Sequence, residues 1–192
     1  MKSSQDLSRR LVLASIASLF TLRPARSETG LWQSLRSGGA VALMRHALAP
    51  GTGDPPDFTL ENCTTQRNLS PKGREQARAI GAAFRGNGID RARVFSSRWC
   101  RCLDTAALLG LGKVVPLPAL DSFFGERARG PAQTDALRQF LIQLPLGPPV
   151  VMVTHQVNIT ALTAVFPRSG EVVFMGLGKE SGVEVLGRAQ PA

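Results

Sequence analysis

The chain has 192 residues, a length suited to one ordinary domain. Apolar residues make up 43% and charged residues 19%, which excludes a disordered or collagen-like chain and allows a buried core. Lysine and arginine outnumber aspartate and glutamate by 23 to 14, but the basic residues beyond residue 27 are scattered and tyrosine is absent, so no nucleic-acid partner is expected.

Residues 1–27 have a pattern of their own. They hold five basic residues and one acidic residue, an apolar run over 11–22, and small residues at the spacing of a signal-peptidase site. This order is typical of an export signal peptide, and Ser8-Arg9-Arg10 resembles the twin-arginine type. The apolar run is shorter than the ~20 residues that span a bilayer. We expect a cleaved signal, a mature domain over 28–192 that is periplasmic or extracellular, and no integral membrane span after cleavage.

Strands and helices are expected to alternate along the rest of the chain. Ser70-Pro71 is typical of a helix start, and the loop over 47–69, rich in proline, glycine and aspartate, is long enough to be a functional or lid segment. The pattern predicts an α/β fold with three layers, α/β/α, around a mostly parallel central sheet. The expected elements in chain order are a strand at 39–44, a helix at 71–86, strands at 92–96 and 114–117 with a helix at 101–109 between them, a helix at 132–144, a strand at 150–153, a helix at 157–165, and strands at 171–175 and 182–186.

Both histidines of the chain directly follow a predicted buried strand. His46 follows Arg45 after the first strand, and His155 follows the strand at 150–153. Ligands of open α/β sheets bind at the carboxyl ends of strands, so the two imidazoles should meet there. Arg101 begins a helix after another strand and can face the same crevice, where arginines match phosphate oxygens. Arg98 is expected instead to pair with an acidic residue at the surface.

These residues resemble the histidine phosphatase superfamily, in its branch with phosphoglycerate mutases and phosphohistidine phosphatases. The match runs from roughly residue 39 to residue 187, and four blocks in the family's order carry it. They are Leu43-Met44-Arg45-His46-Ala47, with alanine for the family's glycine; Leu69-Ser70-Pro71-Lys72-Gly73-Arg74-Glu75-Gln76-Ala77; Ser96 to Ala106; and Val153-Thr154-His155.

The resemblance implies a covalent mechanism in which His46 attacks phosphorus and water then hydrolyses the phosphohistidine. A neutral imidazole is a competent nucleophile near neutral pH. Arg45, Arg101 and His155 would hold the phosphoryl oxygens and compensate charge in the transition state. The resemblance implies no metal and no other cofactor.

The general acid is the main departure from the family. The position of the family's usual glutamate corresponds to Ser122. Asp121 and Glu126 are the candidate acids, and a site without an acid remains a third possibility, since an N–P bond has a better leaving group.

Further residues are candidates for substrate binding. Arg67 either reaches the pocket from the long loop or anchors that loop. Gln156, in place of a family glycine, and Asn158 either contact substrate or have structural roles. Phe123 and Phe124 either line a cleft or belong to the core.

Three cysteines follow the predicted signal. Cys100 and Cys102 are poorly placed to pair with each other, so Cys63 is expected to pair with one of them in an oxidising compartment. The spacing matches no zinc site.

The leading hypothesis is an exported, metal-independent phosphatase acting on a small phosphorylated compound or a phosphorylated envelope component. A phosphohistidine phosphatase, an envelope sugar-phosphate phosphatase and a catalytically weak phosphate-binding protein remain alternatives. A mutase is disfavoured, because the matched span leaves little room for the loops that would exclude water from a bisphosphorylated intermediate.

Overall fold

The computed structural model describes residues 27–145, 147–178 and 182–192. The export signal predicted over 1–27 therefore lies, apart from Ser27, outside the described residues. No helix in the described part of the chain combines the length and apolar character needed to cross a membrane.

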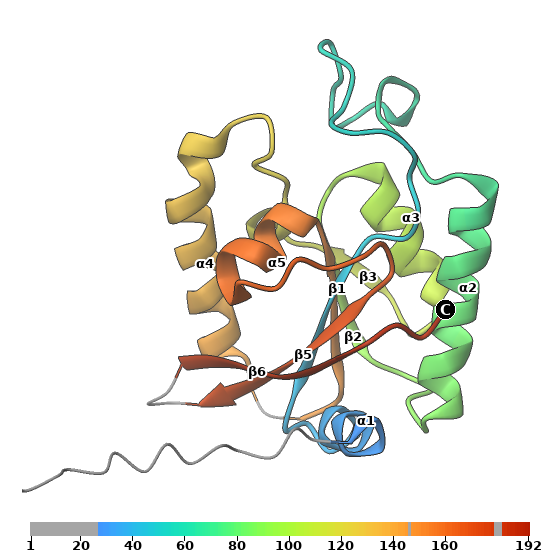
Figure 1. Ribbon diagram of the computed structural model, residues 1–192, viewed down its shortest axis with the longest axis vertical. Helices are drawn as coiled ribbons and strands as arrows, with labels where there is room; N and C mark the ends of the chain where they lie inside the picture. Colours follow the sequence, from blue (N-terminus) through green and yellow to red (C-terminus); the bar gives the residue numbers. More distant parts are fainter. Residues whose placement is uncertain (1–26, 146, 179–181) are drawn as a thin grey trace, which may run out of the picture.

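A six-stranded sheet forms the centre of the fold (Figure 1). The first four strands are parallel, whereas β5 runs antiparallel to β1, and β6 returns antiparallel to β5. The predicted α/β fold with a mostly parallel sheet is therefore confirmed. In spatial order the strands are β3 (Val114–Pro116), β2 (Arg93–Ser96), β4 (Val150–Thr154), β1 (Val41–Arg45), β5 (Val172–Gly178) and β6 (Gly182–Ala189).

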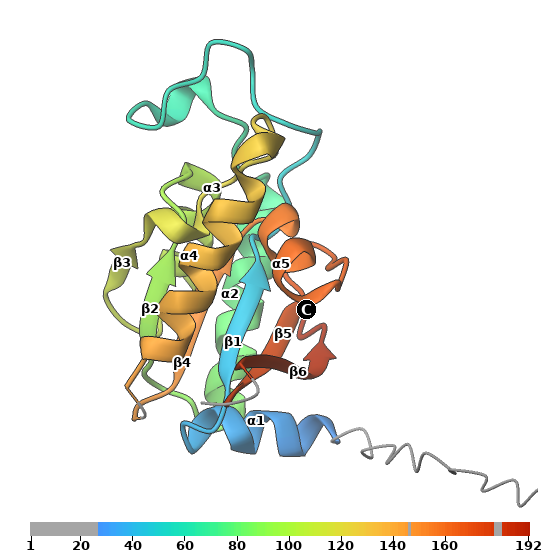
Figure 2. The same cartoon turned by 90° about the vertical axis from the view of Figure 1, so that its left-hand side faces the viewer.

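Helices cover both faces of the sheet, as Figure 2 shows for the face beneath α4. On one face, α2 (Pro71–Gly86) and α3 (Cys100–Leu109) pack over a core that α1 (Glu28–Arg36) completes at the foot of the sheet. In that core the ring of Trp32 meets Phe84 and Phe174 edge to face, at centroid distances of 5.0 and 4.9 Å. On the other face, α4 (Gly130–Gln143) and α5 (Gln156–Thr163) close a second core.

Local chemistry explains the start of α2, which was predicted from Ser70-Pro71. The Ser70 side chain accepts a hydrogen bond from the amide of Gly73 at 3.0 Å, so it caps the helix. A Cβ atom at Gly73 would overlap the carbonyl of Leu48. Glycine at this position therefore lets the beginning of the long loop lie directly on the helix.

Helix α1 was not predicted. Ser27 caps it by accepting a hydrogen bond from Gly30, and Leu31, Trp32 and Leu35 are buried against the core. This 3–4 residue spacing is the ordinary signature of an amphipathic helix. The predicted export signal ends at residue 27 and does not account for the capping role of Ser27.

Candidate functional site

The strand register brings the candidate residues to one edge of the sheet. Arg45 pairs with Thr154, so the next residues, His46 and His155, leave their strands side by side. The amide of His46 donates to the carbonyl of Thr154 at 2.9 Å, and the amide of Ser97 donates to that of Val153 at 2.9 Å. The two imidazole ring centres lie 5.5 Å apart, as expected from the sequence.

The imidazole of His46 is held in one tautomer. Its Nδ1 lies 2.7 Å from the carbonyl oxygen of Ala47, which can only accept, so Nδ1 carries the proton and Nε2 keeps its lone pair. Burial, followed by the charge of Arg101, lowers the pKa of His46 to about 3. The imidazole is therefore neutral at neutral pH, which nucleophilic attack requires. Ala164 is the sole non-glycine residue with positive φ in the described chain, so Ala47 replaces the family's glycine without backbone strain.

His155 is held from behind by a chain of hydrogen bonds. Its Nδ1 faces Nη2 of Arg101 at 3.4 Å, and a guanidinium can only donate, so Nε2 carries the proton and donates to the Ser97 hydroxyl at 2.8 Å. That hydroxyl donates to Oδ1 of Asp121 at 3.3 Å. Burial, then the charge of Arg101, lowers the pKa of His155 well below its ordinary value.

Three arginines surround the histidines. Arg45 donates to the carbonyl of Pro167 at 3.1 Å, Arg67 donates through Nε to the carbonyl of Gly53 at 2.6 Å, and the Arg101 side chain is buried. The buried Nε atoms of Arg45 and Arg101 have no hydrogen-bond partner within the described residues. Both arginines line the same pocket as the histidines, so their guanidinium charge is held where an oxyanion could be bound.

Asp54, from the long loop, enters the site and was not predicted. Its carboxylate holds Arg101 in a bidentate pair, with O···N distances of 2.7 and 3.1 Å, and both side chains are almost fully buried. It also accepts from the indole Nε1 of Trp99 at 3.0 Å and from the amide of Arg67 at 3.1 Å. Burial acts to raise the pKa of Asp54, but the hydrogen bonds and charge of Arg101 outweigh it and hold that pKa below its ordinary value.

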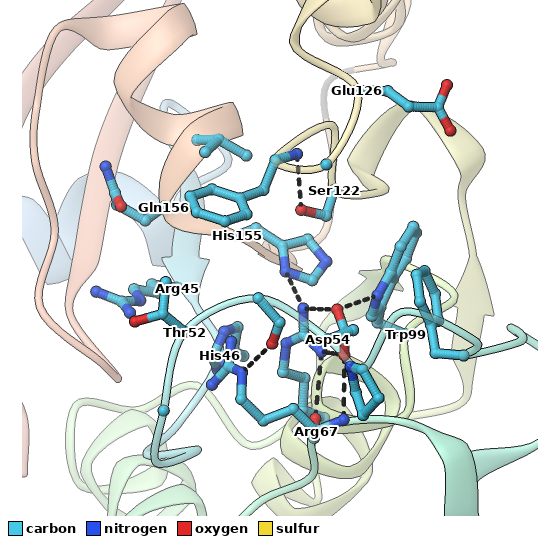
Figure 3. Close-up of a pocket in the computed structure, with 18 of the residues that line it drawn as sticks. Arg45, His46, Thr52, Asp54, Arg67, Trp99, Ser122, Glu126, His155 and Gln156 are labelled. Atoms are coloured by element: carbon cyan, nitrogen blue, oxygen red, sulfur yellow. Dashed lines mark hydrogen bonds and ion pairs between the residues drawn. The ribbon is translucent and has the colours of Figure 1, made fainter.

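These residues line a pocket of about 460 Å³ (Figure 3). The predicted Arg45, His46, Arg101, His155 and Arg67 all face it, and so do Gln156 and Glu126. The Glu126 side chain stands at the rim and is directed away from the two histidines (Figure 3). Within the described residues, no group of three or more His, Cys, Asp or Glu side chains could hold a metal ion.

Two candidates lie behind the pocket wall instead of facing it. Asp121 is buried and forms an ion pair with Arg98 at 2.6 Å, the kind of pairing expected for Arg98. Its carboxylate is bonded to Arg98 and Ser97 and does not line the pocket, so this geometry does not support Asp121 as the acid that protonates a leaving group. Asn158 is also buried, donates to the backbone carbonyl of Asp121 at 2.9 Å and does not line the pocket, which favours its structural role.

A disulfide fixes the loop that carries Asp54 and Arg67. Cys63 pairs with Cys100, at the first residue of α3. The loop also contains the short 3₁₀ helix η1 (Cys63–Thr65). The Gln66 side-chain oxygen accepts a hydrogen bond from the backbone amide of Cys100 at 2.9 Å. Cys102 is free and buried beside His155, and burial raises the pKa of its thiol to about 12.

The sequence contained weak signals for the residues that were missed. Asp54 lies in the run Gly51-Thr52-Gly53-Asp54, inside a loop that its length marked as functional. Trp99 lies two residues before the predicted Arg101, within the block from Ser96 to Ala106.

Comparisons with known proteins agree with this geometry. The family model of the histidine phosphatase superfamily (branch 1) matches residues 41–143. Solved structures with the same fold include the protein histidine phosphatase SixA complexed with tungstate, 17% identical, with a TM-score of 0.59, covering 79% of this chain and 97% of that one. No curated protein sequence matches the chain.

Two further structures have a related fold and a bound ligand. A mutant phosphoserine phosphatase from Entamoeba histolytica in complex with phosphoserine is 12% identical, with a TM-score of 0.57, covering 79% of this chain and 97% of that one. A mycobacterial glucosyl-3-phosphoglycerate phosphatase with inorganic phosphate is 18% identical, with a TM-score of 0.55, covering 76% and 93%.

Proposed function

The chain belongs to the histidine phosphatase superfamily (branch 1) and is a phosphatase, and on that premise we propose that it hydrolyses phosphomonoesters through a phosphohistidine on His46. The observation that carries this proposal is a neutral imidazole whose Nε2 keeps its lone pair, in a pocket that three arginines also line. Such a site has a nucleophile for phosphorus and fixed charge for the phosphoryl oxygens.

The reaction has two balanced steps. Nε2 of His46 attacks phosphorus, the bond from phosphorus to the alcohol oxygen breaks, and that oxygen leaves with the electron pair and takes up a proton from solvent water. Water then attacks the phosphohistidine and gives up a proton to solvent, the N–P bond breaks with its electron pair returning to Nε2, and inorganic phosphate leaves. Arg45 and Arg101 stabilise the charge on the oxygens in both steps.

The supply of the leaving-group proton narrows the substrates. Asp121 is committed behind the wall, Asp54 is held as a carboxylate by Arg101, and the carboxyl of Glu126 is at the rim. Substrates with leaving groups that need little protonation, such as aryl phosphates and phosphoramidates, should therefore react faster than alkyl phosphates. This favours the phosphoramidate alternative, a phosphohistidine phosphatase, as the second candidate function.

We also propose that the protein is exported to an oxidising compartment. The signal-like segment over 1–27 supports this location, and so does the Cys63–Cys100 disulfide, because such bonds persist outside the reducing cytosol. Mass spectrometry of the protein from its host would locate the cleavage site. A full-length, cytosolic, reduced chain would contradict the proposal.

The decisive experiment measures hydrolysis of an aryl phosphate with chelator present. The purified protein should turn over, His46→Ala should lose activity by several orders of magnitude, and acid-labile, alkali-stable phosphate should appear on the wild-type chain during turnover. Asp104→Asn, which changes a half-exposed carboxylate on the same helix as Arg101, is the matched control and should keep full activity. Activity that persists in His46→Ala would overturn the mechanism, and phosphate binding without turnover would indicate a binding protein.

A further inference from the structure

The pocket is larger than the phosphate it is expected to hold. Its volume of about 460 Å³ falls within the roughly 300–1,000 Å³ typical of small-molecule sites. In the proposed reaction the phosphoryl group binds beside His46, His155 and Arg101, which are buried residues of the pocket lining. The outer part of the pocket is left for the organic group that the phosphate is attached to.

Three aromatic side chains line the pocket, those of Phe58, Trp99 and Phe124. On one side, the Trp99 ring packs edge to face on His155, with centroids 5.3 Å apart, and its neighbour Phe58 follows at 5.7 Å. Trp99 therefore connects the phosphoryl end to the outer wall. On the other side, Phe124 stands on the segment between β3 and α4.

Phe124 is a partly exposed aromatic ring in the pocket lining, and Arg127 lies over one of its faces. It is 37% exposed, whereas its neighbour Phe123 is buried in the protein interior. The guanidinium of Arg127 lies 5.3 Å from its centroid. Gly53 of the long loop faces Phe124, since a Cβ atom at Gly53 would lie 3.8 Å from the Phe124 ring. The long loop and the segment of Phe124 therefore approach each other closely, as two lips that both line the pocket.

The two lips favour a small substrate over a phosphorylated protein surface. The long loop rises above the ends of the strands, and the segment leading into α4 rises opposite it (Figure 1). The outward-facing residues Pro55, Pro56 and Phe124 would meet a folded partner before its phosphoryl group reached the buried His46.

We propose that the outer pocket is a subsite for a flat aromatic group, so that the substrates are small phosphomonoesters whose alcohol carries an aromatic ring. This inference rests on the proposed function of the deep pocket, and it adds the class of leaving group. Offset or edge-to-face contacts of the substrate ring with Phe124 and Trp99 provide the recognition. An aryl oxygen is also a leaving group that needs little help from a general acid.

The test compares two phosphonates that cannot be hydrolysed, phenylphosphonate and methylphosphonate, by calorimetry on the purified protein. The native chain should bind the phenyl compound about tenfold more tightly. In Phe124→Ala the ratio of the two affinities should fall towards one, and Phe124→Leu should be intermediate. Ile142→Ala, a similarly exposed apolar residue on α4 that does not line the pocket, is the matched control and should keep the ratio.

Different failures have different meanings. Equal affinities in the native chain, or a ratio that Phe124→Ala leaves unchanged, would overturn the aromatic subsite while leaving hydrolysis at His46 untouched. Faster hydrolysis of a phosphohistidine-bearing protein than of phenyl phosphate would also overturn it. A clear phenyl preference in binding, together with no hydrolysis of phenyl phosphate, would support the subsite and refute the proposed function instead.

Discussion

Replacing Asp54 should both destabilise the protein and strengthen its binding of phosphate. The Arg101 side chain is 3% exposed and the Asp54 side chain 9%, so the pair is buried. Removing one partner of a buried ion pair typically costs about 3–5 kcal/mol. For a domain of this size, about 1 kcal/mol shifts the Tm by roughly 2–4 °C, so Asp54→Ala should lower the Tm by about 10 °C.

Asp54→Asn removes the negative charge of the side chain while keeping its size and shape. The amide keeps an oxygen that can accept a hydrogen bond but no longer neutralises Arg101, whose charge then becomes fully available to an anion. We expect this variant to bind inorganic phosphate about tenfold more tightly than the native chain, equivalent to about 1.4 kcal/mol. Added phosphate should therefore raise the Tm of Asp54→Asn more than that of the native protein.

The assay is thermal unfolding over a phosphate titration, with calorimetry for the Kd. Asp104→Asn is a matched control, because Asp104 pairs with Arg74 on the surface at 2.6 Å, with side chains 35% and 43% exposed. Surface pairs contribute only about 0–1 kcal/mol, so its Tm should change little. Equal losses of stability in the two variants, or equal effects of phosphate on native and Asp54→Asn protein, would refute the reasoning.

Three further predictions follow from the site. The pKa of His46 is about 3 in the folded chain and about 6.5 when unfolded, so between these values the unfolded state binds more protons. The free energy of unfolding should therefore fall as the pH drops from about 6.5 towards 3, by up to ~1.4 kcal/mol per pH unit for this residue. His46→Gln should flatten the curve of Tm against pH. The disulfide joins residues 37 apart, so Cys63→Ser should cost about 4 kcal/mol of stability, and reductant should lower the Tm of the native chain but not of the variant. Ser97→Ala and Asp121→Asn should both reduce kcat by about tenfold or more, because each breaks the hydrogen bonds that link His155 to Ser97 and Asp121. Ser97→Ala leaves the ion pair between Asp121 and Arg98 intact, so a loss of kcat in Asp121→Asn alone would indicate a purely structural carboxylate.

The strand ends were predictable because short-range pattern decides them. Two apolar runs with no polar interruption can be buried only in the centre of a sheet, and parallel pairing then places His46 and His155 together. The family blocks identify Arg45 and Arg101 in the same way. This part of the site depends on which residues follow the buried strands, and that can be read from the sequence.

The contacts of the carboxylates were not predictable. Asp54 reaches Arg101 from 47 residues away, and it does so only because the long loop folds back over the site. Asp121 is close in sequence to the position of the family's acid, but its carboxylate accepts hydrogen bonds from Arg98 and Ser97 behind the pocket wall. The direction of a side chain in a loop depends on contacts with residues distant in sequence, and the hydrophobic periodicity of the sequence does not predict such contacts.

The position of α1 decides which end of the protein is suited to immobilisation or fusion. It lies at the foot of the sheet, at the opposite end of the strands from the pocket (Figure 1). The terminal carboxyl end lies nearer to the site, since Gln76 contacts both the carbonyl of Ala192 and the amide of Leu48, where the long loop begins. Immobilisation or fusion ahead of Ser27 would therefore leave the mouth of the pocket facing outward, which makes this end the better handle for a surface-bound assay.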